Sequence, residues 1–181
     1  MLLRRVLSLL CLPLLSPLAF GQARQALAVP DTCSVTKPAD QPFVPPTPHS
    51  VKPPRGEFWF GTDRLWTRLP ETGAWIGLGH YTPDDPTFRQ KLFFWRQGYD
   101  AHAETQTKLI LSGRRIDAVA PPLQTDGPST GSRKGDDQFL MTGINFPTIG
   151  CWEITGRYGS DELTFVVWVG KKVAVAVAII C

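Results

Sequence analysis

Short apolar runs alternate with turn residues over 56–169, and this pattern restricts the chain to β structure. No stretch keeps an apolar period of 3.6 residues over three helical turns, whereas several runs show the period of two that half-buried strands have. Many short strands with frequent turns predict an all-β fold, an antiparallel sandwich of about seven strands. The candidate strands cover residues 57–60, 64–69, 91–99, 108–117, 138–146, 151–158 and 162–169.

One short helix is also expected, around residues 88–92. Asp84, Asp85 and Pro86 precede it, and Asp suits the N-cap of a helix while Pro suits its first position.

The last two predicted strands form a hairpin around Gly159 and Ser160. A side-chain period of two makes one face of this hairpin apolar, and that face is expected in the core. Val166 and Trp168 make the opposite face of the last strand apolar as well, so this face needs a cover or is a binding surface. The residues expected in the core are Trp152, Ile154, Tyr158, Leu163, Phe165, Val167 and Val169.

Residues 1–21 have the layout of a secretory signal peptide. Two arginines give a basic start, an apolar centre follows, and Ala19 and Gly21 put small residues at the −3 and −1 positions of a cleavage site. A second small pair, Ala26 and Ala28, offers another cleavage position. The apolar centre is shorter than the ~20 residues that a spanning helix needs. We therefore expect a secreted or periplasmic protein with no transmembrane segment in the mature chain.

Residues 22–55 form a segment of different composition, with eight prolines and no glycine between Pro30 and Pro54. Proline restricts its own φ and extends the preceding residue, which predicts a stiff, polyproline-like arm. Such an arm is either a spacer or a proline-rich ligand for a partner groove, and its composition favours the spacer. The predicted organisation is a leader over 1–21, the arm over 22–55, a β-sandwich domain over 56–169 and an apolar tail over 170–181.

Three cysteines follow the predicted leader: Cys33, Cys151 and Cys181. In an oxidising compartment one disulfide is expected, and one thiol is left over. If Trp152 faces the core, Cys151 faces outward, where Cys33 of the arm can reach it. We expect a Cys33–Cys151 bridge that staples the arm to the final hairpin, with Cys33–Cys181 or free thiols as the alternatives.

The charge balance excludes a nucleic-acid binder as the expected class. The full chain has 19 Lys and Arg against 16 Asp and Glu. The leader holds two of the arginines, so the chain without it carries 17 basic and 16 acidic residues and a net charge of +1. Such a balance gives no basic surface for a polyanion.

Aromatic residues are dense in the first half of the predicted sandwich, and two interpretations compete for them. Exposed coplanar rings would stack on sugars, whereas alternation along half-buried strands puts most rings in the core, which is the favoured interpretation. The glycine-rich stretch 75–81 is the expected place for an exposed ring. The candidate ligand-binding residues are Trp75, His80, Tyr81 and Trp168.

Catalytic and metal-binding patterns are scarce. The sequence contains no phosphate-binding loop, no H-E-x-x-H and no C-x-x-C motif. We therefore expect no enzyme, no cofactor and no metal site. A metal-dependent hydrolase is kept as an alternative, with His80, Asp84, Asp85 and His102 as its candidate residues.

Two further segments carry expectations of their own. Residues 121–137 are polar and rich in turn residues, which predicts a long mobile loop. Residues 173–180 are apolar, with Val and Ala alternating before two isoleucines. This run is too short to span a bilayer, and it suits either a strand that adds to a sheet edge or a poorly ordered end.

The pattern P-T-I-G-C-W-E-I-T-G at 147–156, followed by L-T-F-V-V at 163–167, resembles the closing strands of bacterial immunoglobulin-like domains. The whole chain is similar to small exported bacterial proteins of uncharacterised function. The resemblance implies an immunoglobulin-like sandwich and supplies no catalytic residues. The chain departs from antibody domains, because no cysteine lies in an earlier strand to pair with Cys151.

These observations predict a secreted, non-catalytic binding or interaction module of the bacterial cell envelope, with a protein or glycan partner. A carbohydrate-binding module that uses exposed Trp and Tyr rings is the first alternative. The metal-dependent hydrolase is the second.

Overall fold

The computed structural model describes residues 29–49, 52–104, 106–132 and 138–172. These residues form strands and loops without a helix, which confirms the all-β prediction. Among them, no helix has the length and apolar character needed to cross a membrane. The predicted leader and most of the predicted tail lie outside the described residues.

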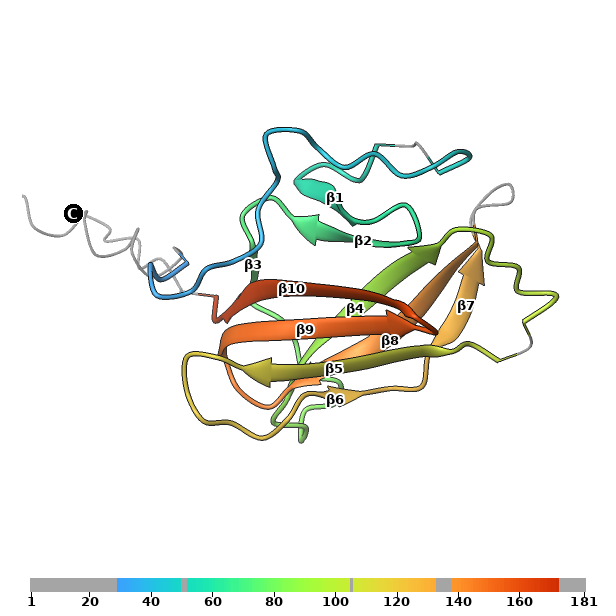
Figure 1. Cartoon of the computed structure of the whole chain (residues 1–181). Coiled ribbons are helices and arrows are strands. Elements are labelled where there is room, and N and C mark those ends of the chain that lie inside the picture. Colours follow the sequence, from blue (N-terminus) through green and yellow to red (C-terminus); the bar gives the residue numbers. More distant parts are fainter. Residues whose placement is uncertain (1–28, 50–51, 105, 133–137, 173–181) are drawn as a thin grey trace, which may run out of the picture.

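The strands form two sheets that pack face to face (Figure 1). In the first, here called sheet A, β1 (Glu57–Gly61), β2 (Leu65–Pro70), β4 (Phe88–Arg96) and β8 (Gln138–Phe146) follow one another, and β6 (Gln124–Thr125) and β7 (Ser129–Ser132) both pair with β8. In sheet B the order is β3 (Ala74–Ile76), β10 (Asp161–Gly170), β9 (Gly150–Tyr158) and β5 (Leu109–Arg115). Pairing is antiparallel except between β3 and β10.

All seven predicted strands are present, with ends displaced by at most three residues. The helix predicted over 88–92 is wrong, because Phe88 begins β4 and lies opposite Phe146 of β8. A neighbouring strand that pairs with this main chain, and a core that takes Leu92 and Phe94, outweigh a weak local capping signal. The prediction of a loop over 121–137 is also corrected, because β6 and β7 pair with β8 inside it.

The main core lies between the two sheets and contains large side chains from both, such as Phe94 of sheet A and Phe165 of sheet B. The facing predicted for the last hairpin is confirmed, since all seven of its core residues are buried. Strand β10 extends one residue further than predicted, to Gly170.

A second apolar cluster lies outside the main core and contains the buried residues Trp66, Trp95 and Phe139. These residues come from three neighbouring strands of sheet A, and partly buried Trp59, Phe93 and Met141 pack against them. Sheet A therefore packs apolar side chains on both faces, because Phe94 enters the main core while its neighbour Trp95 enters this cluster. The packing therefore supports the interpretation that most of these aromatic rings lie in the interior.

Residues 29–49 run beside β10 of sheet B and then over sheet A, and the blue segment of Figure 1 passes β3 before it continues above β1. On sheet B, Thr36 pairs with Val166 of β10: the Thr36 N–H donates to the Val166 carbonyl at 2.8 Å, and the Val166 N–H donates to Thr36 Oγ1 at 2.9 Å. On sheet A, Phe43 packs on the second cluster and the His49 ring lies 5.4 Å from that of Trp66. The segment thus pairs with the edge of β10 at Val166, next to the residues 168–170 with which β3 pairs.

Candidate functional site

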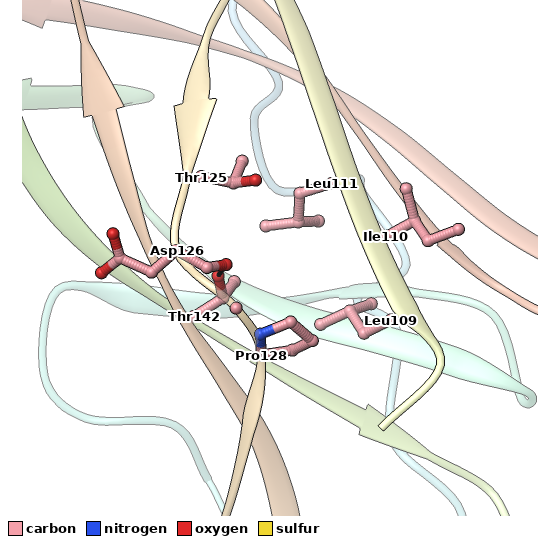
Figure 2. Close-up of a pocket in the computed structure, with 8 residues that line it drawn as sticks. Leu109, Ile110, Leu111, Thr125, Asp126, Pro128 and Thr142 are labelled. Atoms are coloured by element: carbon pink, nitrogen blue, oxygen red, sulfur yellow. Dashed lines mark hydrogen bonds between the residues drawn. The ribbon is translucent and has the colours of Figure 1, made fainter. Parts of the chain in front are cut away.

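A cavity of about 240 Å³ opens between β5, at one edge of sheet B, and the residues around β6, at one edge of sheet A. Figure 2 shows the side chains of Leu109 and Leu111 turned towards β6, while that of Ile110 points away. We call this cavity the seam. The residues that line it are Leu109, Ile110, Leu111, Thr125, Asp126, Gly127, Pro128 and Thr142.

Two hydrogen bonds close the seam at its ends. The Leu123 N–H donates to the Gly113 carbonyl at 3.2 Å, just beyond the last seam residue of β5. At the other end Thr107 Oγ1 donates to the Pro128 carbonyl at 3.1 Å. The seam is therefore a short slot with defined ends.

Strand β5 presents main-chain groups to this slot. The Gly113 carbonyl bonds to Leu123 and so faces the open edge of the sheet. Because bonding direction alternates along an antiparallel strand, the N–H and C=O of Leu109 and Leu111 face that edge too. The strand pairings and hydrogen bonds among the described residues include none that uses these four groups. The slot thus combines unpaired main chain with apolar side chains.

The β6 wall of the seam is held by a polar cluster around Asp126. Its N–H donates to the Gly143 carbonyl at 2.9 Å, and its carbonyl accepts from Thr142 Oγ1 at 2.9 Å. Its carboxylate accepts a hydrogen bond from Arg89, which also donates to Asn145 Oδ1 at 3.1 Å. Figure 2 shows this carboxylate turned away from Leu111, so the charge stabilises the wall without facing the apolar part of the slot.

The structure forms the predicted disulfide between Cys33 and Cys151, whose Cα atoms are 5.6 Å apart. Both residues are buried, and Cys151 lies opposite Trp168 in the β9–β10 ladder. The bridge therefore fixes the arm beside the outer face of sheet B.

The four predicted ligand-binding residues do not form one surface. Trp75 lies in β3 and packs on Phe146, with ring centroids 5.9 Å apart. Trp168 is half-buried and lies in the neighbouring strand β10, one residue out of register with Trp75 in the parallel pairing. His80 and Tyr81 are neighbours in the loop between β3 and β4. The glycan-binding hypothesis stays a prediction that rests on Tyr81 alone among these rings.

Tyr81 is the exposed ring of the stretch 75–81, with 68% of its surface accessible. The Arg89 guanidinium lies 4.4 Å from the centre of this ring, a distance at which cation–π attraction holds the two together. His80 Nδ1 lies 2.7 Å from the Thr87 carbonyl. The hydroxyl and N–H of Thr87 donate to Asp85, which lowers the pKa of that carboxyl.

The candidate metal ligands are not gathered into a site in the described part of the chain. There, no group of three or more His, Cys, Asp or Glu residues lies close enough to hold a metal ion. His102 donates its main-chain N–H to Asp100 at 2.8 Å and lies in the loop that follows β4.

No motif in the sequence marks the seam, so it was not predicted. Gly127 and Pro128 lay inside a segment predicted to be a loop, and a pocket between two sheet edges depends on residues that are far apart in the chain. The exposed polar pattern of β5, in which Ile110, Ser112 and Arg114 face outward, was the available sign of an edge strand.

Comparison of the chain with protein-family models, with curated proteins and with solved structures finds no match in any of the three. The function is therefore inferred from the geometry of the chain itself.

Proposed function

We propose that this protein is an exported, non-catalytic binding module of the cell envelope that holds a short extended peptide segment of a protein partner in the seam. The observation that carries the proposal is the unpaired main chain of Leu109 and Leu111, which faces a cavity whose β5 wall presents apolar side chains. Peptides that add to a sheet edge obtain affinity from main-chain hydrogen bonds and specificity from pockets for alternate side chains.

The size of the cavity favours a side chain over a whole small molecule. Its volume of about 240 Å³ is below the roughly 300–1,000 Å³ that small-molecule pockets have. The bonds at Gly113 and Thr107 leave a free stretch of only four β5 residues, 109–112. The occupant is therefore two or three residues in extended conformation, with one apolar side chain in the cavity.

Two features support the export that this proposal includes. Residues 1–21 have the pattern of a secretory leader. The buried Cys33–Cys151 disulfide suits an oxidising compartment outside the cytoplasm.

A substitution at Gly127 tests the seam. A Cβ at Gly127 meets no atom within 4 Å, so Gly127→Phe adds a ring to the seam wall without a clash at its Cβ. Gly79→Phe is the matched control, because Gly79 is equally open and lies in the β3–β4 loop. The probe is a set of acetylated and amidated hexapeptides with Val, Leu or Phe at alternating positions, added to 15N-labelled protein.

We expect at least one of these peptides to shift the amide signals of Leu109, Leu111 and Gly127 in the wild type and in Gly79→Phe. Gly127→Phe should lose these shifts, because its ring fills the slot. Shifts that persist unchanged in Gly127→Phe, or a complete set of peptides that shifts none of these signals, would contradict the proposal.

We also infer that the sandwich is of the immunoglobulin-like type, with the proline-rich arm as an addition. Immunoglobulin constant domains place strands A, B, E and D in one sheet and C, F and G in the other. The neighbours β2, β4, β8 and β6 correspond to the first set, and β5, β9 and β10 to the second. An experimental structure in which β4 and β8 are not neighbours would exclude this assignment.

A further inference from the structure

We propose that the outer face of sheet A binds a proline-rich, extended segment of a protein partner, and that residues 37–49 of the arm occupy this face as an internal competitor. We call residues 37–49 the strap. The blue segment of Figure 1 runs above β1, the strand at the edge of sheet A. This surface is distinct from the seam, and the inference does not depend on peptide binding there.

The outer face of sheet A is built from aromatic rings. Trp66, Trp95 and Phe139 are buried on it, and Trp59 and Phe93 pack against them. The ring centroids of Trp59 and Trp95 are 4.9 Å apart, and those of Trp95 and Phe139 are 5.8 Å apart. Proline-rich segments dock on surfaces lined by aromatic rings in this way, and they arrive already extended. The face therefore has the chemistry of a polyproline-binding surface.

The strap shows which kind of ligand fits this face. The rings of Phe43 and His49 lie 6.5 Å and 5.4 Å from that of Trp66, and Pro45 between them is buried. Positions 42–46 read P-F-V-P-P, so the prolines restrict this stretch to extended geometry before it makes any contact. Pro42 and Val44 are exposed, so the segment contacts the sheet with one side.

The strap is held by its side chains and not by its main chain. Between residues 37 and 45 the main chain makes no hydrogen bond to any other main-chain group that the structure describes. The chain is fixed on both sides of the strap, by the bonds between Thr36 and Val166 and by the Glu71 N–H, which donates to the Gly56 carbonyl at 2.9 Å. Segments with few such bonds open at a low cost in free energy. The strap can therefore leave sheet A while both sheets stay intact.

The strap leaves one polar group of this face without a partner. Trp66 is fully buried, and its indole Nε1–H has no hydrogen-bond acceptor within the described ranges of the chain. A buried indole N–H normally donates to an acceptor, and an unsatisfied donor destabilises the state that contains it. A partner segment that places a main-chain carbonyl at Trp66 Nε1 gains a hydrogen bond that the strap does not make. This difference favours the partner over the strap.

The occupant that these contacts select is a proline-rich segment with an aromatic residue two positions before a proline, as Phe43 stands before Pro45. The strap competes from a high effective concentration because it is tethered on both sides. The face is therefore closed in the free protein and opens to a partner that binds it better than the strap does.

A peptide that copies the strap tests the inference on the protein with its disulfide formed. The probe is the acetylated and amidated decapeptide of residues 40–49, which contains no tryptophan, so that tryptophan emission reports on the protein alone. Phe43→Ala removes the main contact of the strap, and it should bind the peptide roughly tenfold or more tightly than the wild type, because the open fraction rises. Binding should shift the emission of this variant to the blue and move the Trp66 indole N–H signal in 15N spectra.

A second variant loosens the strap without removing a contact. Pro42 is exposed, and Pro42→Gly makes the released strap more flexible, so the peptide should bind roughly two- to fivefold more tightly than to the wild type. Val44→Asp is the matched control, because Val44 is 64% accessible, and it should bind the peptide like the wild type. A peptide with serine in place of its phenylalanine and of the proline two positions later should bind none of these proteins.

Equal affinity of the wild type, Phe43→Ala and Pro42→Gly for the peptide would overturn the inference, and so would binding that leaves the Trp66 indole signal unchanged. A dimer of the wild type in light scattering that Phe43→Ala abolishes would assign the face to the arm of a second copy instead. The hexapeptides that probe the seam act on Leu109, Leu111 and Gly127, so their result is independent of these outcomes.

Discussion

Tyr158 is a buried residue whose hydroxyl has a specific hydrogen-bond partner. Its hydroxyl donates to the Glu104 carboxylate, which also accepts from Arg96 at 3.3 Å. The Arg96 guanidinium lies 4.8 Å from the centre of the Tyr158 ring. Burial, together with the bond to Glu104, raises the pKa of Tyr158 to about 12.

Tyr158 should therefore make the stability of the fold depend on pH in the alkaline range. Its folded pKa of about 12 lies above the value of 10.0 for a free tyrosine, so the neutral form is favoured by folding. This contribution is complete below about pH 10 and is lost as the pH rises through 12, which amounts to roughly 3 kcal/mol. Urea unfolding of the wild type and Tyr158→Phe between these limits measures it. The difference in free energy of unfolding should shrink with pH, and a constant difference would contradict the assignment.

At the scale of elements, the arm is attached to sheet B through two neighbouring contacts. The disulfide joins Cys33 to Cys151 of β9, and the Thr36 main chain and hydroxyl bond to Val166 of β10. Gly73 has a φ of +70°, and a Cβ at this position would meet Cβ of Val35 at 2.7 Å. The turn before β3 therefore requires glycine both for its backbone and to let the arm approach.

Removal of the disulfide should destabilise the protein substantially. The bridge spans 118 residues, and a loop of that length constrains the unfolded chain by about 5 kcal/mol in the entropic account. Cys33→Ser with Cys151→Ser should lower the free energy of unfolding by about this amount in urea titrations. Cys181→Ser is the control and should leave it unchanged. A large effect of Cys181→Ser would instead indicate a bridge that involves Cys181.

At the scale of the whole molecule, the arm contacts both sheets. One part lies beside β10 of sheet B, and Phe43 and His49 lie over Trp66 of sheet A. Trp66 is fully buried although it points away from the main core. The outer face of sheet A thus depends on the arm for its cover.

Truncation of Phe43 should expose that face. Phe43→Ala removes a half-buried ring from the second cluster, and we expect a loss of about 2 kcal/mol in the free energy of unfolding, less than for a fully buried phenylalanine. Tryptophan emission should shift to the red as water reaches Trp66. Val44→Ala, at a site that is 64% accessible, should change stability by less than about 0.5 kcal/mol. Equal effects of the two substitutions would show that the arm does not stabilise sheet A.

A local sequence pattern predicts those parts of the fold in which the environment of each residue depends on its neighbours in the sequence. The facing of residues 152–169 follows from a period of two on either side of a Gly159 turn, and it is confirmed. The helix expected over 88–92 failed because capping residues contribute little against strand pairing with β8. The short strands β6 and β7 were not predicted, because their sequences are polar and they adopt strand conformation only through pairing with β8.

In the candidate site, too, some features could be predicted from the sequence and others could not. The Cys33–Cys151 bridge was predictable, because only the facing of Trp152 and the composition of the arm were needed. The seam was not predictable, since its walls come from β5, the β6 region and β8, and its unpaired main chain results from the sheet edge on which β5 lies.

By itself the sequence determined the strand character of this chain and the faces of its final hairpin, because the periodicity of apolar side chains is a local property. Only the tertiary structure decided which strands are neighbours, which edges stay open and which of the possible cysteine pairings forms. These properties depend on contacts between segments that are distant in the chain, and the free energy of such contacts is settled by packing and not by local preference.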